Sequence, residues 1–151
     1  MLCDNNQAEM FVTVWLGILE ISTDRMTCSN AGHEYPTICK KDGAFELYKD
    51  RHSFVIGGME GVPYKEYTLS MEPGDKLFVY TDGVPEAIDK NDEMFGVARM
   101  VEALNNNAAG RPEEILRNVR SAVDAFVGDA EKFDDLTMMC LEYRGSESSS
   151  L

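Results

Sequence analysis

The sequence has few of the residues that build histidine or cysteine metal centres. It holds two histidines, His33 and His52, which are too few for a histidine-rich site. The four cysteines are widely spaced and form no C-x-x-C pair, and three of them lie in strand-like runs, where cysteine usually acts as a small buried hydrophobe. We therefore expect neither a disulfide framework nor a zinc site, and we predict a reducing cytoplasm as the compartment.

Long apolar runs and an excess of basic charge are also missing. No apolar run approaches the length of a membrane span, and the first residues lack the basic start and apolar core of a signal peptide. The formal net charge of −13 argues against nucleic acid or an anionic membrane surface as the main partner. We expect no nucleic-acid binding and no membrane attachment of this segment.

The composition is that of one globular domain. With 151 residues, of which 44% are apolar, the chain is long enough to bury a core. Phe11 to Ile21 predicts a long, largely buried strand with Trp15 in the core. Shorter strands are predicted in six further places: Arg25–Ser29, Thr37–Lys40, Phe45–Tyr48, Tyr67–Met71, Leu77–Tyr80 and Phe133–Leu141.

Two helices are predicted between the last two strands. Apolar residues at helical spacing indicate one helix roughly from Asp92 to Asn105. A second helix starts at Pro112 and is stopped by Gly128. This order predicts an α+β fold in which the last strand returns to a sheet already built. The serine-rich residues 144–151 are predicted to form a flexible tail.

Carboxylates stand at the ends of two predicted strands. Asp82, followed by Gly83, ends one strand, and Asp134 and Asp135 precede the last one. If these strands are antiparallel neighbours, the carboxylates lie close together, and clustered carboxylates repel unless a cation or proton sits between them. Mg²⁺ and Mn²⁺ prefer such oxygen ligands. Aspartates at strand ends are also ordinary turn or capping residues, and the residues alone leave both interpretations open.

Three other features have two interpretations each. His33 could be a catalytic acid, but a loop-fixing hydrogen bond is the favoured role. Glu86 could orient water at a metal or simply be a solvated or capping residue. Residues 57–63 could form a flap, but we predict a surface loop.

Six short motifs occur in one order along almost the whole chain. They are Met10–Thr13 (MFVT), Asn30–His33 (NAGH), Pro73–Asp75 (PGD), Tyr80–Ala87 (YTDGVPEA), Met94–Gly96 (MFG) and Phe133–Thr137 (FDDLT). Together they resemble the C-terminal portion of the SpoIIE/RsbU-type serine phosphatases, bacterial relatives of the metal-dependent type 2C protein phosphatases. Glu34-Tyr35 and Pro85 are small departures that touch no carboxylate.

The resemblance implies a fold, a cofactor and a reaction. The fold would be part of an α-β-β-α sandwich with antiparallel sheets and two helices. Two Mn²⁺ or Mg²⁺ ions in the complete domain would activate water for attack on phosphoserine or phosphothreonine. Asp82 and Asp134 match the family's metal-binding residues, with Asp135 a less certain neighbour. Members typically dephosphorylate an anti-sigma-factor antagonist.

One departure from the family pattern is large. Nothing before Met10 resembles the family's acidic Gly-Asp segment or its Gly-Asp-Val-Ser-Gly-Lys-Gly-like strand. Residues 1–143 are therefore expected to be a truncated phosphatase domain with weak metal binding and little activity. The missing N-terminal strands should leave a sheet edge bare, which favours self-association. A non-catalytic regulatory or scaffold module that keeps the partner surface is the alternative.

Overall fold

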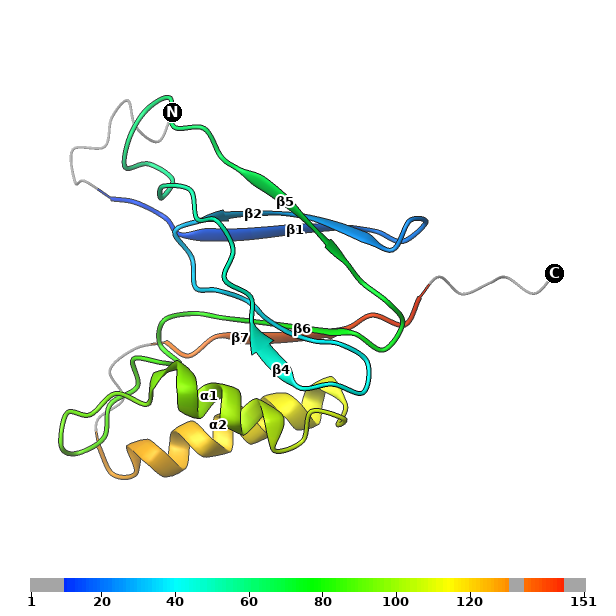
Figure 1. The fold of residues 1–151 in the computed structure, drawn as a ribbon. Helices are drawn as coiled ribbons and strands as arrows, with labels where there is room; N and C mark the ends of the chain where they lie inside the picture. The colour runs from blue at the N-terminus through cyan, green and yellow to red at the C-terminus, as the bar shows by residue number, and fades with distance from the viewer. Residues whose placement is uncertain (1–9, 131–134, 146–151) are drawn as a thin grey trace. The chain divides into compact units, whose positions relative to one another are not determined.

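A computed structural model describes residues 10–130 and 135–145 of the chain. The chain divides into two compact units (Figure 1). Among the described residues, the first unit comprises residues 10–34, Lys49–Met71 and Gly145, and the second comprises Tyr35–Tyr48, 72–130 and 135–144.

The first unit contains a three-stranded antiparallel sheet in the order β1-β2-β5. Its strands are β1 (Val14–Glu20), β2 (Arg25–Ala31) and β5 (Glu66–Ser70). A tight turn with Asp24 at a φ of 56° joins β1 to β2. The central strand β2 carries the buried side chains Met26 and Cys28, which face the same side as Leu69 of β5.

Strand β1 differs from the long buried strand predicted over Phe11 to Ile21. Its side chains alternate between half-buried and exposed, and Leu16 and Ile18 are 53% and 62% exposed. The apolar run predicted burial on both faces, but successive side chains of a strand point to opposite sides and only one side is covered. The prediction of a largely buried strand is wrong. Trp15 is half-buried.

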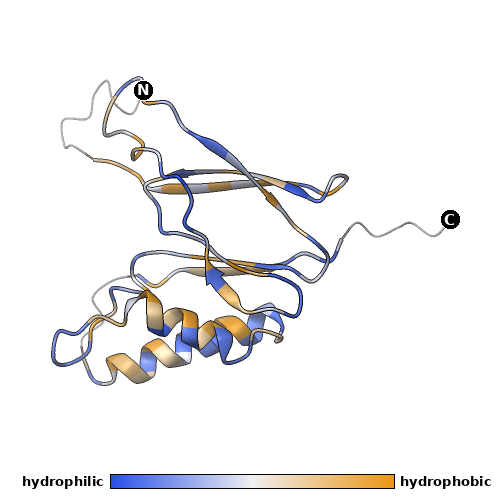
Figure 2. Ribbon diagram, viewed as in Figure 1, coloured by the Kyte–Doolittle hydropathy of each residue, from blue (hydrophilic) through white to orange (hydrophobic). Residues whose placement is uncertain are grey.

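The second unit contains a four-stranded antiparallel sheet and both helices. The sheet order is β4-β3-β6-β7, formed by β3 (Thr37–Cys39), β4 (Phe45–Leu47), β6 (Lys76–Tyr80) and β7 (Met138–Glu142). Helices α1 (Gly96–Asn105) and α2 (Pro112–Val127) lie side by side along the sheet (Figure 1). Apolar and hydrophilic residues alternate along both helices, as expected for helices that bury one face (Figure 2).

The core of the second unit lies between the sheet and the two helices. Its fully buried members include Phe45, Phe78, Met100, Leu104, Ile115 and Val119. The ring of Phe95 also meets that of Phe126 edge-on, with centroids 5.5 Å apart. Apolar area removed from water contributes roughly 25 cal/mol per Å², so this layer is the main stabilising element of the unit.

The start of α1 also differs from the prediction. The helix begins at Gly96 and not at Asp92, because the side chain of Asp89 holds the backbone of residues 91–93 in a turn before the helix. Its Oδ1 accepts hydrogen bonds from the amides of Asn91 (2.8 Å) and Glu93 (2.9 Å). Asp92 itself has a φ of 61°, which a helix does not allow. Helix α2 begins at Pro112 as predicted.

The predicted α+β class, with antiparallel sheets and two helices, is confirmed. Cys28, Cys39 and Cys140 lie in strands as free thiols. Among the described residues, no helix has the length and apolar character needed to cross a membrane. Residues 131–134, which include the first two residues of the last predicted strand, and 146–151, in the predicted tail, lie outside the described residues.

Candidate functional site

Asp82 lies in the turn that follows β6, between buried residues. Leu77, Phe78 and Val84 on either side of it are almost fully buried, whereas Asp82 is exposed. The chain turns immediately after the strand, because the Val84 amide donates to the Thr81 carbonyl at 3.0 Å. The Gly83 amide donates to Asp82 Oδ1 at 3.0 Å. This bond fixes one carboxylate oxygen and leaves the exposed group on a well-anchored turn.

The start of the β7 segment lies directly beside this turn. Strands β6 and β7 are antiparallel, with Tyr80 opposite Met138. The Thr81 amide continues the pairing by donating to the Thr137 carbonyl at 3.0 Å. A Cβ atom placed on Gly83 would come within 2.5 Å of the Asp135 carbonyl oxygen. The predicted meeting of the two strand ends is confirmed, and it brings the turn that holds Asp82 beside the irregular segment that holds Asp135.

These carboxylates suit a hard divalent cation by their chemistry. Asp82 and Asp135 offer oxygen ligands, and Mg²⁺ commonly uses one or two carboxylates and keeps several waters. Asp134, the third predicted ligand, lies outside the described residues. Within the described parts of the chain, no group of three or more histidine, cysteine, aspartate or glutamate side chains could hold a metal ion. The donor types therefore fit the ion, and the described set is smaller than a complete site.

The two other candidate residues have mainly backbone contacts. The Glu86 amide donates to the Asp82 carbonyl at 2.9 Å, and its side chain is exposed. The His33 amide donates to Asn30 Oδ1 at 2.8 Å, and His33 Nδ1 lies 3.3 Å from Thr13 Oγ1. The contacts of His33 fix a loop of the first unit. Residues 57–61 form a turn in which Met59 is 62% exposed.

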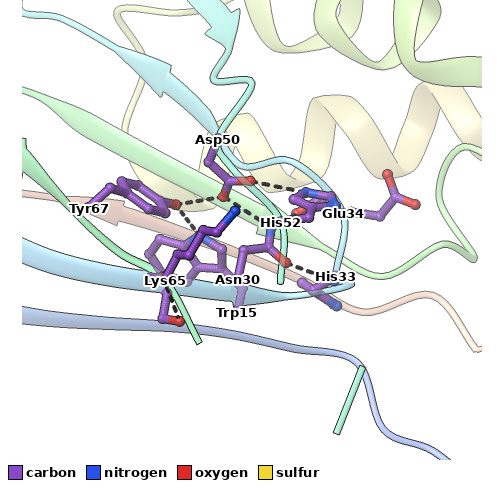
Figure 3. Close-up of polar contacts among 9 residues, drawn as sticks. Trp15, Asn30, His33, Glu34, Asp50, His52, Lys65 and Tyr67 are labelled. Carbon is purple, nitrogen blue, oxygen red and sulfur yellow. Dashed lines mark hydrogen bonds and ion pairs between the residues drawn. The ribbon is translucent and has the colours of Figure 1, made fainter. Parts of the chain in front are cut away.

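A buried polar network in the first unit was not predicted from the sequence (Figure 3). The side chain of Asp50 is fully buried and lies at its centre. Its Oδ2 accepts hydrogen bonds from the Tyr67 hydroxyl (2.7 Å) and from Asn30 Nδ2 (3.0 Å). Its Oδ1 lies 3.0 Å from His52 Nε2. The Tyr67 hydroxyl in turn accepts a bond from Trp15 Nε1 at 2.8 Å.

Two groups in or beside this network have raised pKa values. Burial, reinforced by the hydrogen bond to Asp50, raises the pKa of Tyr67. Burial, with the negative charge of Asp50, raises the pKa of Cys28 to about 12. Cys28 is therefore a neutral thiol at physiological pH and a poor nucleophile. Because Asp50 and His52 lie in an irregular segment, no periodicity in the sequence links them to Tyr67 or Asn30.

Comparisons with known proteins give one consistent family. A family model described as Stage II sporulation protein E (SpoIIE) matches residues 1–144. Protein IcfG of Synechocystis sp. is 30% identical over 138 residues, which cover 91% of this chain and 22% of that protein. Phosphoserine phosphatase RsbU of Bacillus subtilis is 24% identical over 140 residues, which cover 91% of this chain and 40% of that protein. The chain thus spans less than half the length of either relative.

Solved structures share the fold at low sequence identity. The SiaA-PP2C domain of Pseudomonas aeruginosa has a TM-score of 0.74 and 17% identity, covering 93% of this chain and 56% of that chain. The phosphatase domain of SpoIIE from Bacillus subtilis, in a crystal form without domain swapping, has a TM-score of 0.70 and 17% identity, covering 92% of this chain and 59% of that chain. These likenesses show that the chain has the fold of part of a PP2C-type phosphatase domain.

Proposed function

Since the chain belongs to the SpoIIE family, we propose that residues 1–143 are part of a metal-dependent protein serine/threonine phosphatase domain. The observation that carries this proposal is the contact of the two strand ends, which sets Asp82 and Asp135 in adjacent segments of the chain. The RsbU relative is a phosphoserine phosphatase by name. That name and the shared fold support the same reaction for the complete domain.

The ligands proposed for a divalent ion are Asp82, Asp135 and Asp134. A bound Mn²⁺ or Mg²⁺ would supply an activated water and stabilise negative charge on the phosphoryl oxygens. The chain's own contribution is to place the carboxylates. The Gly83 amide fixes the rotation of the Asp82 carboxylate, and the buried strand β6 fixes its base. Prior fixation matters because it removes the reorganisation that a flexible ligand set would need on binding the ion.

Three carboxylates are too few to fix two ions in catalytic geometry. We therefore expect the chain alone to bind Mn²⁺ weakly and to hydrolyse phosphoserine slowly. The proposed substrate is a phosphoserine or phosphothreonine on a regulatory protein, such as an anti-sigma-factor antagonist. A relative from Mycobacterium tuberculosis, Rv1364c, carries RsbU and RsbW domains in one structure, which supports a regulatory protein as the partner. The proposed compartment is the cytoplasm.

Release of phosphate from a phosphoserine protein tests the reaction. The chain should give slow turnover that requires Mn²⁺ and disappears in Asp82→Asn. Asp92→Asn is a matched control, because Asp92 is an exposed carboxylate whose φ of 61° asparagine also tolerates. Turnover that persists in Asp82→Asn would contradict the proposed site. Absence of both Mn²⁺ binding and turnover would favour the alternative, a non-catalytic regulatory or scaffold module.

Self-association through β1 is a second proposal about partners. Within residues 10–130 and 135–145, β1 pairs with β2 on one side and with no strand along its other edge. Leu16 and Ile18 are exposed on one face of it. Antiparallel pairing of two β1 strands about Gly17 would set each Leu16 opposite the other copy's Ile18, and no charged residues would face each other. Bare apolar edges of this kind favour pairing between copies.

A further inference from the structure

The hydroxyl of Thr81 joins the end of β6 to the segment that precedes β7. Its Oγ1 accepts a hydrogen bond from the Thr137 amide at 3.2 Å. The same Oγ1 donates to the Asp135 carbonyl at 3.3 Å. With the bond from its own amide to the Thr137 carbonyl at 3.0 Å, Thr81 makes three hydrogen bonds to this segment. Two of them need the hydroxyl.

These bonds hold backbone that the sheet itself does not hold. The paired register of β6 and β7 ends at Tyr80 and Met138, so residues 135–137 lie beyond the last strand pair. The carbonyl of Asp135 reaches the Thr81 hydroxyl at the point where it also packs against Gly83. A side chain at position 83 would occupy that space. Residues 81 and 83 therefore both constrain the carbonyl group of Asp135.

We infer that Thr81 is a positioning residue, which sets the place of Asp135 relative to Asp82 through its hydroxyl. The inference rests on the proposed function, because it assigns the two carboxylates to one divalent ion. The Thr81 hydroxyl is already engaged by two backbone groups, so its role is exerted through the backbone of Asp135. Groups that orient metal ligands in this way typically contribute about 10- to 100-fold to metal affinity.

A purely structural role for Thr81 makes a different prediction from a positioning role. Thr81→Val keeps the shape and removes the hydroxyl, whereas Thr81→Ser keeps the hydroxyl and removes a methyl group. Thr137→Val is the matched control, since it makes the same chemical change on the facing residue. The hydrogen bonds of Thr137 to Thr81 use its backbone amide and carbonyl, and these remain in the control variant.

The test is a Mn²⁺ titration of the whole chain. The concentration of free ion is measured from its electron paramagnetic resonance signal. Thr81→Val should raise the Mn²⁺ dissociation constant about tenfold or more, and Thr81→Ser and Thr137→Val should stay near the wild-type value. Amide exchange at Thr137 should also become faster in Thr81→Val. If the valine variant does not fold, Thr81→Ala replaces it, because alanine removes the hydroxyl without adding an apolar branch.

Different results would overturn the inference and the proposed function. Wild-type affinity in Thr81→Val, with weaker binding in Asp82→Asn, would remove the positioning role and keep the metal site. Weak binding in Thr81→Val that Thr81→Ser does not restore would also overturn the positioning role. Equal affinities for wild type and Asp82→Asn would remove the proposed site, and the role of Thr81 with it.

Discussion

The carbonyl oxygen of Asp135 lies so close to Gly83 that a Cβ atom on the glycine would come within 2.5 Å of it. Gly83→Ala should therefore push the Asp135 segment away from the turn. We expect a loss of stability of about 1 to 3 kcal/mol from this overpacking, together with weaker Mn²⁺ binding. Urea unfolding and the Mn²⁺ titration measure the two effects.

Gly61→Asn is the control for this substitution. A Cβ atom at Gly61 meets nothing within 4 Å, and asparagine tolerates its φ of 71°. Unchanged stability in Gly83→Ala would show that the turn at Gly83 and the Asp135 segment do not touch as described.

The buried carboxylate of Asp75 should make the stability of the second unit depend on pH. Its side chain is 1% exposed and accepts hydrogen bonds from the amides of Glu72 (2.9 Å) and Lys41 (2.8 Å) and from Lys40 Nζ (2.7 Å). Burial opposes ionisation, but the Glu72 amide, the Lys40 ammonium and the Lys41 amide together hold the pKa of Asp75 below its ordinary value of 3.8.

Because the folded-state pKa is the lower one, the stabilisation is present above pH 3.8 and is lost as the pH falls through the folded value. Asp75→Asn should lose about 2 kcal/mol at pH 7 and unfold with a shallower pH dependence below pH 3.8. Lys40→Met should cost less than about 1 kcal/mol, since Lys40 is 59% exposed. If the stability of Asp75→Asn falls below pH 3.8 as steeply as that of the wild type, groups other than Asp75 cause the acid sensitivity.

The Asp50 network should be a main source of stability in the first unit. Tyr67→Phe removes one of the two hydrogen bonds to Asp50 Oδ2. It also removes the acceptor of the hydrogen bond from Trp15 Nε1. We expect a cost of about 1 to 3 kcal/mol. Trp15 is the single tryptophan of the chain, and its fluorescence during unfolding reports directly on this network. Tyr64→Phe is the control, since Tyr64 is 44% exposed, and an equal cost there would contradict the account.

Edge pairing predicts that one charge on β1 prevents self-association. Ile18→Lys puts a charge on the exposed face of the edge strand, a common natural protection of such edges. Light scattering at high protein concentration should show dimers in the wild type and monomers in this variant. Met94→Lys, which changes an equally exposed apolar residue of the second unit, should stay dimeric. A wild-type chain that is monomeric at all concentrations would end this proposal.

The sequence predicted those features that have a local signal. The period of apolar residues located α2, and Asp82-Gly83 after an apolar run located the turn at the end of β6. The order of six motifs predicted the family, which the match over residues 1–144 confirms. The fold class followed from the order of elements.

The sequence could not predict features that depend on distant partners. The burial of Asp50 needs Tyr67 and Asn30, which come from two different strands. The exposure of Leu16 and Ile18 depends on which side of the sheet is covered, and an apolar strand carries no such information. The late start of α1 came from side-chain bonds of Asp89, which compete with helical ones.

The central claim is that Asp82 binds a divalent cation, and one titration tests it most directly. Mn²⁺ is titrated into wild type, Asp82→Asn and Asp92→Asn, and the free ion is measured. We predict that Asp82→Asn binds at least about tenfold more weakly than wild type, whereas Asp92→Asn binds as the wild type does. Equal Mn²⁺ binding by wild type and Asp82→Asn would remove Asp82 from the site and contradict the account.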